Sequence, residues 1–198
     1  MPKKVDHAER KDQIVKATFN VIYYYGFEKT TLREIAKKAG LSLSSVQYFF
    51  PKQKDIYTFA MEVIFQKFKE RMQKVGQVEQ DVFENAVRRV KQIVQVHTEE
   101  ERMENDIWVK FTLMATMNPE YQGLKEEYRK INLNFAEDVL RILYESGYIT
   151  NTDNIKEGAH SLIIFITGLV FESVIYTNFY NDQVVEKKAR DYLINICN

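Results

Sequence analysis

Apolar residues recur three and four positions apart along almost the whole chain, which is the spacing of one face of an α-helix. No alternation of period two persists for the length of a strand. The pattern therefore predicts an all-α fold. The expected helices cover residues 6–25, 31–39, 43–50, 52–75, 79–97, 99–117, 119–146, 152–178 and 182–196.

Capping residues, glycines and prolines mark the ends of these helices. Asp6 with Glu9 resembles a capping box, and Gly26 is a typical C-terminal stop. Thr31 with Glu34 resembles a second capping box, which opens the second helix. The later joints are expected at Gly76, at Asn118 and Pro119, at Gly147 and at residues 151–154.

The second and third helices are short and are joined by a tight break. Ala36 is small enough for two helices to pack there, and Gly40 allows the positive φ that a sharp turn needs. Ser42 is a natural N-cap for the third helix, and Pro51 ends it. The apolar residues that would lock the helices together are Ile35, Leu41, Val46 and Phe49. This arrangement predicts a helix-turn-helix, whose third helix enters the major groove of DNA.

The outward face of the third helix carries side chains that can read bases. It consists of Leu43, Ser44, Ser45, Gln47 and Tyr48. Glutamine can bind adenine through N6 and N7, and serine can bind bases or phosphates. Thr31 and Lys54 would approach the phosphates from either side, with Lys52 close to Lys54. An ordinary helical hairpin with a polar outer face would show the same spacing.

Charge distinguishes the first part of the chain from the rest. The formal net charge is zero, but residues 1–54 hold 11 Lys and Arg against 5 Asp and Glu. Residues 55–198 hold the remaining 17 basic and 23 acidic residues. A basic end on an acidic body indicates a polyanionic partner for the first part, although chance clustering of surface charge gives the same split.

Composition and apolar runs limit the compartment. Cys197 is the single cysteine, which fits a reducing compartment and excludes an internal disulfide. The first residues, MPKKVDHAERKDQ, lack the apolar core of a signal peptide. The longest apolar run begins at Leu162 and is too short to span a bilayer. We therefore expect a cytoplasmic protein with no membrane partner.

A family resemblance rests on residues 30–56, TTLREIAKKAGLSLSSVQYFFPKQKDI, with GF-x-x-T-T beginning at Gly26 and a long helix before it. This stretch resembles the DNA-binding region of the tetracycline-repressor (TetR) family of bacterial transcription regulators, over about residues 8 to 60. The resemblance implies a helix-turn-helix domain over residues 1–51 and a larger helical domain for ligand binding and dimerisation over residues 52–198.

The family also implies how such a protein acts. A homodimer would read two half-sites of a near-palindromic operator in double-stranded DNA, about one helical turn apart. A small molecule would bind the larger domain, shift the DNA-binding heads and release a repressor from its operator. The positions that the resemblance assigns to DNA contact are Arg33, Ser44, Ser45, Gln47 and Tyr48.

The helix expected over residues 152–178 is apolar on nearly all sides, which indicates burial on more than one face. One face can meet its own domain, and we hypothesise that the other meets a second copy. Gly158, Ala159 and Gly168 would permit close approach, and the last helix would complete a four-helix interface. A helix buried wholly within one chain is the alternative.

Aromatic residues on the expected helices suggest a ligand pocket in the larger domain. The candidate ligand contacts are Trp108, Phe111, Met114, Tyr128, Phe135, Phe165, Glu172 and Tyr176. An apolar cavity with a few polar groups is the usual small-molecule site, but aromatics at helical spacing also form ordinary cores. Glu172 stands in an apolar run, where an unpaired carboxylate is costly, unless it reaches solvent.

Catalytic and metal signatures are not found. Neither His97 nor His160 has a partner at a strong metal-ligand spacing, and there is no glycine-rich phosphate loop, nucleophile elbow or zinc signature. We therefore expect no metal, no cofactor and no enzymatic activity. A helical adaptor, a ligand-independent regulator and a helical-bundle enzyme remain alternatives, and a steep salt dependence of binding would favour DNA.

Overall fold

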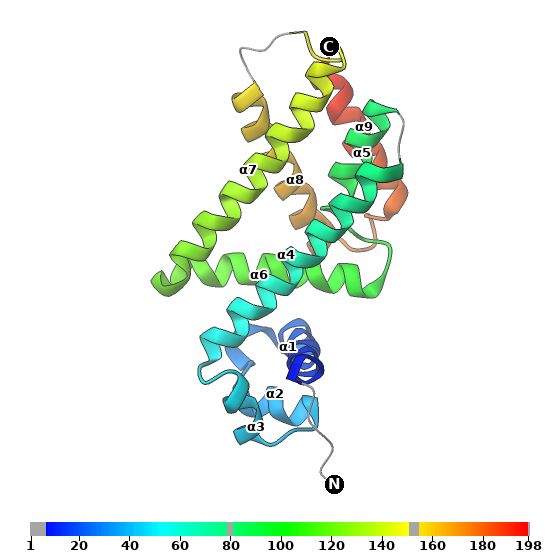
Figure 1. Cartoon of the computed structure of the whole chain (residues 1–198). Helices are drawn as coiled ribbons and strands as arrows, with labels where there is room; N and C mark the ends of the chain where they lie inside the picture. Colours follow the sequence, from blue (N-terminus) through cyan, green and yellow to red (C-terminus); the bar gives the residue numbers. More distant parts are fainter. Residues whose placement is uncertain (1–6, 79–80, 151–154, 198) are drawn as a thin grey trace.

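The computed structural model describes residues 7–78, 81–150 and 155–197 of the chain. Within these ranges the regular structure is entirely helical, which confirms the all-α prediction. Figure 1 shows a small head at one end, a larger bundle at the other, and α4 running from the head into the bundle. The elements are α1 (His7–Lys29), α2 (Leu32–Ala39), α3 (Leu43–Phe49), α4 (Gln53–Val78), α5 (Val82–Lys91), α6 (Glu99–Met117), the 3₁₀ turn η1 (Pro119–Tyr121), α7 (Gln122–Glu145), α8 (Ile155–Ile175) and α9 (Asp182–Cys197).

The ends of the first two helices follow the expected signals with one difference. Gly26 has the positive φ of a stop, 74°, but a further helical turn follows and α1 continues to Lys29. Thr31 caps α2 as expected, because its hydroxyl accepts a hydrogen bond from the Glu34 amide at 3.2 Å. The expected capping box of the first helix includes Asp6, which lies outside the described residues.

The turn between α2 and α3 has the predicted geometry. Gly40 adopts a left-handed conformation with φ 67°, and the next amide donates to the Ala36 carbonyl at 2.9 Å. Ser42 then caps α3 by accepting from the Ser45 amide at 3.1 Å. These two caps fix the angle at which α3 leaves the turn.

The residues predicted to lock α2 and α3 together are buried to different degrees. Ile35 and Val46 are fully buried, as expected. Leu41 and Phe49 are half-buried and pack against the same core, while Phe50, which was not predicted, is 4% exposed and packs on the ring of Phe59 at 5.5 Å between centroids. The reason is that α3 ends at Phe49, so Phe50 leaves the helical path (φ −135°, ψ 86°) and its ring enters the core.

The head and the bundle share a hydrophobic core. Ile22 and Ile35 of the head belong to the same buried cluster as Met61 of α4 and Phe111 of α6. Lys110 of α6 also donates to the carbonyl of Tyr23 in α1 at 2.9 Å. The boundary expected at residue 51 therefore falls between helices that pack on one another.

The middle of the chain departs from the predicted helix ends. Helix α4 continues through Gly76 to Val78, and α5 ends at Lys91 instead of extending to residue 97. Between α5 and α6 the chain is irregular, and Val94 and Val96 are buried there. Helix α6 begins as expected, because Thr98 and Glu101 form a complete capping box.

Helix α8 is buried on one face and open on the other. Leu162, Ile166 and Val170 enter a second core with α5, α7 and α9, whereas Ile164 is 72% exposed and Phe171 and Ile175 are also exposed. The apolar residues around the helix therefore divide between one face that is buried and one face that is exposed to solvent in the single chain. By length and composition alone α8 could cross a membrane, a criterion that core helices of soluble proteins also meet.

Candidate DNA-binding surface and ligand cavity

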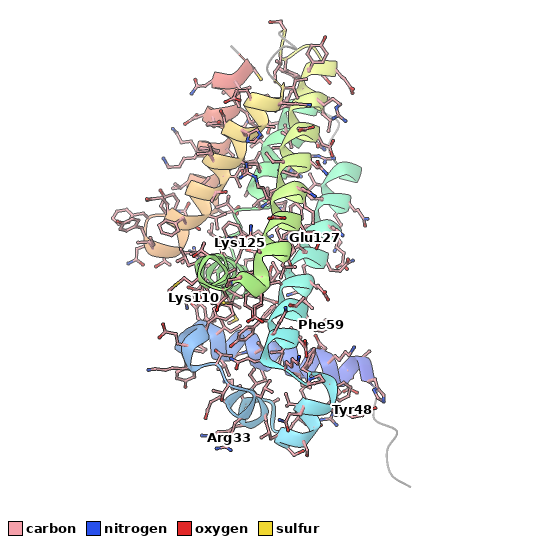
Figure 2. All side chains as sticks on the ribbon, turned by 90° about the vertical axis from the view of Figure 1, so that its left-hand side faces the viewer. Arg33, Tyr48, Phe59, Lys110, Lys125 and Glu127 are labelled. Atoms are coloured by element: carbon pink, nitrogen blue, oxygen red, sulfur yellow. The ribbon has the colours of Figure 1, made fainter. Side chains whose placement is uncertain are left out.

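The predicted DNA contacts lie together on the outer end of the head. On α3, Ser44, Gln47 and Tyr48 are exposed, and Tyr48 reaches 71% exposure. Figure 2 shows Arg33 of α2 and Tyr48 of α3 at the end of the molecule away from the larger bundle. Ser45 and Leu43 are half-buried, because they face partly toward the core that Val46 anchors.

Local contacts hold this surface in place. The Ser42 hydroxyl, besides capping α3, lies 3.0 Å from the Ser44 hydroxyl. The ring of Tyr48 lies edge-on to Phe49, at 5.1 Å between centroids, and His7 of α1 lies 6.1 Å from Tyr48 and 5.4 Å from Phe49. Sequence reasoning did not single out His7, because only the folded head brings the first turn of α1 against α3.

The basic side chains of the head differ in their surroundings. Arg33 and Lys52 are exposed. Lys54 instead reaches toward the body, where its ammonium donates to the Glu120 carbonyl at 3.3 Å and lies 3.8 Å from the Glu120 carboxylate. Lys54 would have to leave Glu120 in order to bind a phosphate.

A cavity of about 70 Å³ lies in the larger bundle, between α4, α6, α7 and α8, with Ile93 from the segment after α5. Its apolar walls are Ile64, Phe65, Phe68, Ile93, Trp108, Ile163, Ile166 and Val170. Its polar walls are Arg71, Glu104, Asn105, Asn132 and Thr167. Of the ligand contacts expected from the sequence, Trp108 is the one that lines this cavity.

Two of the other expected contacts support the cavity wall from behind. Tyr128 stacks on Phe65 with ring centroids 3.8 Å apart, and Phe135 lies edge-on to Phe68 at 5.6 Å. The Tyr128 hydroxyl is buried without a hydrogen-bond partner among the described residues, and burial raises its pKa.

The remaining expected contacts lie away from the cavity. Phe111 is buried against Phe27 and Tyr121 in the core that the head shares, and Met114 packs on the same core. Phe165 stacks on Tyr192 of α9 with centroids 4.0 Å apart. The other two, Glu172 and Tyr176, are exposed on α8.

Glu172 has a local partner. Its carboxylate accepts a hydrogen bond from the hydroxyl of Tyr180 at 3.3 Å. The carboxylate avoids the cost of burial because it stands on the exposed face of α8, where it reaches solvent. Helical spacing identifies aromatic and acidic positions of this kind but does not reveal which of several packed faces each one enters.

Sequence reasoning missed the charged groups of the cavity. Glu104 is 6% exposed and accepts hydrogen bonds from Lys67 at 2.7 Å and from Arg71 at 3.1 Å, which ties α6 to α4. Burial would lower the pKa of Lys67, but its bonds to Glu100 and Glu104 raise it overall. Lys67 and Arg71 are four residues apart on one face of α4, a spacing that suggests a shared acidic partner without naming it.

Comparisons with known proteins agree with this geometry. Residues 14–58 match the family model described as "Bacterial regulatory proteins, tetR family". The chain is 25% identical to the HTH-type transcriptional regulator PksA of Bacillus subtilis over 202 residues, which covers 100% of this chain and 94% of that protein. It is 28% identical to the regulator BetI of Stenotrophomonas maltophilia over 128 residues, covering 63% of this chain and 64% of that protein.

Solved structures share the whole fold. A transcriptional regulator from Saccharomonospora viridis in complex with choline has a TM-score of 0.83 at 20% identity, over 94% of this chain and 96% of that one. A TetR-family regulator from Rhodococcus has a TM-score of 0.82 at 15% identity, over 96% and 100%. Residues 14–58 therefore match the helix-turn-helix region of the TetR family of bacterial regulatory proteins, in the small N-terminal head, and the whole chain shares the fold of these solved structures.

Proposed function

We propose that this protein is a cytoplasmic homodimeric repressor, which a small-molecule effector releases from a near-palindromic operator in double-stranded DNA. The observation that carries the proposal is the exposed face of α3, held at a fixed angle by the Gly40 turn and the Ser42 cap. Residues 1–51 serve as the DNA-reading unit and residues 52–198 as the unit for ligand binding and dimerisation.

Helix α3 would read the bases, and residues near it would position the head on the DNA by binding phosphates. Gln47 and Tyr48 are exposed and can reach base edges in the major groove, with Ser44 and Ser45 beside them. The groups that would bind phosphates are Thr31, Arg33, Lys52 and Lys54. Lys54 would exchange its contact with Glu120 for a phosphate when DNA binds.

The exposed face of α8, together with α9, would form the dimer interface. Ile164, Phe171 and Ile175 form an exposed apolar stripe one to two turns apart, and Ile194 of α9 is exposed as well. Exposed apolar stripes of this kind mark association surfaces. A second copy would cover the same stripe with its own, which is the self-complementary contact of a two-fold dimer.

The effector would act through the cavity and α4. Helix α4 begins at Gln53 beside the head and contributes Phe65, Phe68 and Arg71 to the cavity wall. A ligand that fits one position of α4 better than another would shift the two heads relative to one turn of DNA. The choline complex of the related fold supports a small-molecule effector as the class of signal.

Fluorescence anisotropy of the full-length protein tests this function. The DNA is the sequence around its own gene, and a scrambled duplex is the control. We expect tight binding that prefers the native DNA and weakens steeply with salt, because phosphate contacts release counterions. Gln47→Ala should reduce the preference for the native DNA by about tenfold, since a bidentate base contact contributes ~1–3 kcal/mol.

Two results would argue against the proposal. Weak binding that is equal on both duplexes and insensitive to salt would favour a protein-binding adaptor. A Gln47→Ala variant that weakens binding to both duplexes equally would show that α3 does not read bases through this residue.

A further inference from the structure

One residue of the cavity wall, Arg71, has a buried hydrogen-bond donor for which the described part of the chain offers no acceptor. Arg71 extends from α4 into the cavity wall, and its Nη1 donates to Glu104 at 3.1 Å. Its Nε is buried and has no hydrogen-bond partner among the described residues. An unpaired buried donor is costly, so this N–H favours a ligand that brings an acceptor.

The walls around this donor require an apolar ligand body. Phe65, Phe68 and Trp108 present three aromatic rings, and Ile163 and Val170 close the side formed by α8. Such walls bind apolar surface, while the few polar groups orient the ligand. Asn132 adds an amide that can bind a second oxygen of the ligand head.

The hydrogen bonds beside the cavity favour a negative ligand head. Lys67 and Arg71 both pair with the buried Glu104, and Lys67 also pairs with Glu100, which is 73% exposed, so the four charges balance. Both carboxylate oxygens of Glu104 already accept hydrogen bonds. A carboxylate would therefore gain a charge-assisted hydrogen bond from Arg71 Nε, whereas an ammonium group would meet the guanidinium of Arg71 and find no free oxygen on Glu104.

We propose that this cavity binds an amphipathic carboxylate, whose head accepts from Arg71 Nε and whose apolar body lies against Phe65, Phe68 and Trp108. This ligand class deepens the proposed function and rests on it for its biological meaning. The binding itself can be measured without DNA.

The site also explains how the effect of ligand binding would be transmitted to the head. The ligand shares Arg71 with Glu104, so its carboxylate weakens the tie between α4 and α6. The cavity holds about 70 Å³, whereas an engineered cavity that binds benzene measures about 150 Å³. A ligand with six or so carbon atoms therefore displaces a wall, and α4 is the wall that continues to the head.

Trp108 is the only tryptophan of the chain and lines the cavity, so its fluorescence reports binding directly. The probes are hexanoate, 1-hexanol and hexylamine, then 3-phenylpropionate with its matching alcohol and amine, and choline. We expect each carboxylate to bind about tenfold or more tightly than its alcohol, because a charge-assisted bond to arginine is gained. The amines and choline should bind more weakly still.

The head-group comparison uses the unmodified protein, so it does not depend on a variant that folds. A preference for the amines or choline, equal binding of all head groups, or no saturable response to either carboxylate would overturn the proposal.

Variants of Arg71 locate the head group. Arg71→Gln should abolish the carboxylate preference, about a tenfold change, and Arg71→Lys should retain part of it because the charge remains. Arg129→Gln, on an exposed position of α7, is the matched control and should bind like the unmodified protein. If folded Arg71→Gln, checked by thermal melting, keeps the full preference, the head group does not bind Arg71 and the assignment is wrong.

Anisotropy with and without hexanoate separates this proposal from the proposed function. Carboxylate binding that leaves operator affinity unchanged would confirm the ligand class and refute effector control. Release of the operator by choline but not by carboxylates would support effector control and overturn the ligand class.

Discussion

At the scale of single residues, a few backbone positions determine how the head presents α3. Gly40 occupies a left-handed conformation that other residues adopt only with strain, and Thr31 and Ser42 satisfy the amides at the starts of the two helices. These features could be predicted because turn glycines and caps act over three or four residues. The inward turn of Phe50 could not, because it depends on where Phe59 lies.

Gly40→Ala should lower the free energy of unfolding by about 1 kcal/mol, since an alanine in the left-handed region is strained by its Cβ. Urea unfolding of the full-length protein measures the change. Gly123→Ala is the control, because Gly123 lies in α7 with open space around it and no positive φ. Equal effects of the two substitutions would contradict the role of backbone conformation at Gly40.

At the scale of helices, polar contacts fix which elements pack side by side. Helix α5 is joined to α9 by Arg190, which binds both carboxylate oxygens of Glu84. The start of α6 could be predicted from Thr98 and Glu101. The end of α5 could not, because the apolar spacing continues as a helical pattern while Val94 and Val96 are buried in an irregular segment.

The pair between α5 and α9 should make stability depend on pH. The hydrogen bond from Arg190 lowers the pKa of Glu84, so the folded state holds this carboxylate ionised at a pH where the unfolded chain would protonate it. The stabilisation is therefore present near neutral pH and is lost as the pH falls below about 4.5 and through the lowered pKa. Both side chains are about one-third exposed, so we expect about 1 kcal/mol or less.

Urea unfolding at neutral and acidic pH measures this effect. Glu84→Gln should be less stable than the unmodified protein at neutral pH, and the difference should shrink in acid. Arg190→Gln should cause a similar loss, and the double variant should lose less than the sum of the two. Full additivity, or a difference that grows in acid, would be inconsistent with the pair.

At the scale of the whole molecule, helix α6 separates two environments. Phe111 faces the core that the head shares, while Trp108, three residues earlier, lines the cavity. Residues three apart stand close together on one face of a helix, so periodicity could predict that both aromatics face inward but not which one reaches a ligand. Periodicity could not predict the charged cluster around Glu104 either, because the partners of Glu104 come from another helix, α4.

The open face of α8 belongs to this scale as well. Ile164→Glu should convert a dimer into a monomer, because it places a charge within an apolar stripe that a second copy would cover. Sedimentation velocity at micromolar concentration measures the mass. Met117→Glu on α6, which replaces a residue that is 83% exposed, should leave the dimer intact. A monomeric unmodified protein, or identical behaviour of the two variants, would refute dimerisation through α8.

The shared core at the base of the bundle has a consequence for exchanging parts between regulators of this fold. A cut at residue 51 would separate the Tyr57 hydroxyl from the Thr30 carbonyl, to which it donates at 2.8 Å, and would uncover Ile22 and Ile35. A transplanted head would then meet a foreign α4 and α6. Chimaeras should therefore keep the first half of α4 with the head and match the lower surface of α6 to it.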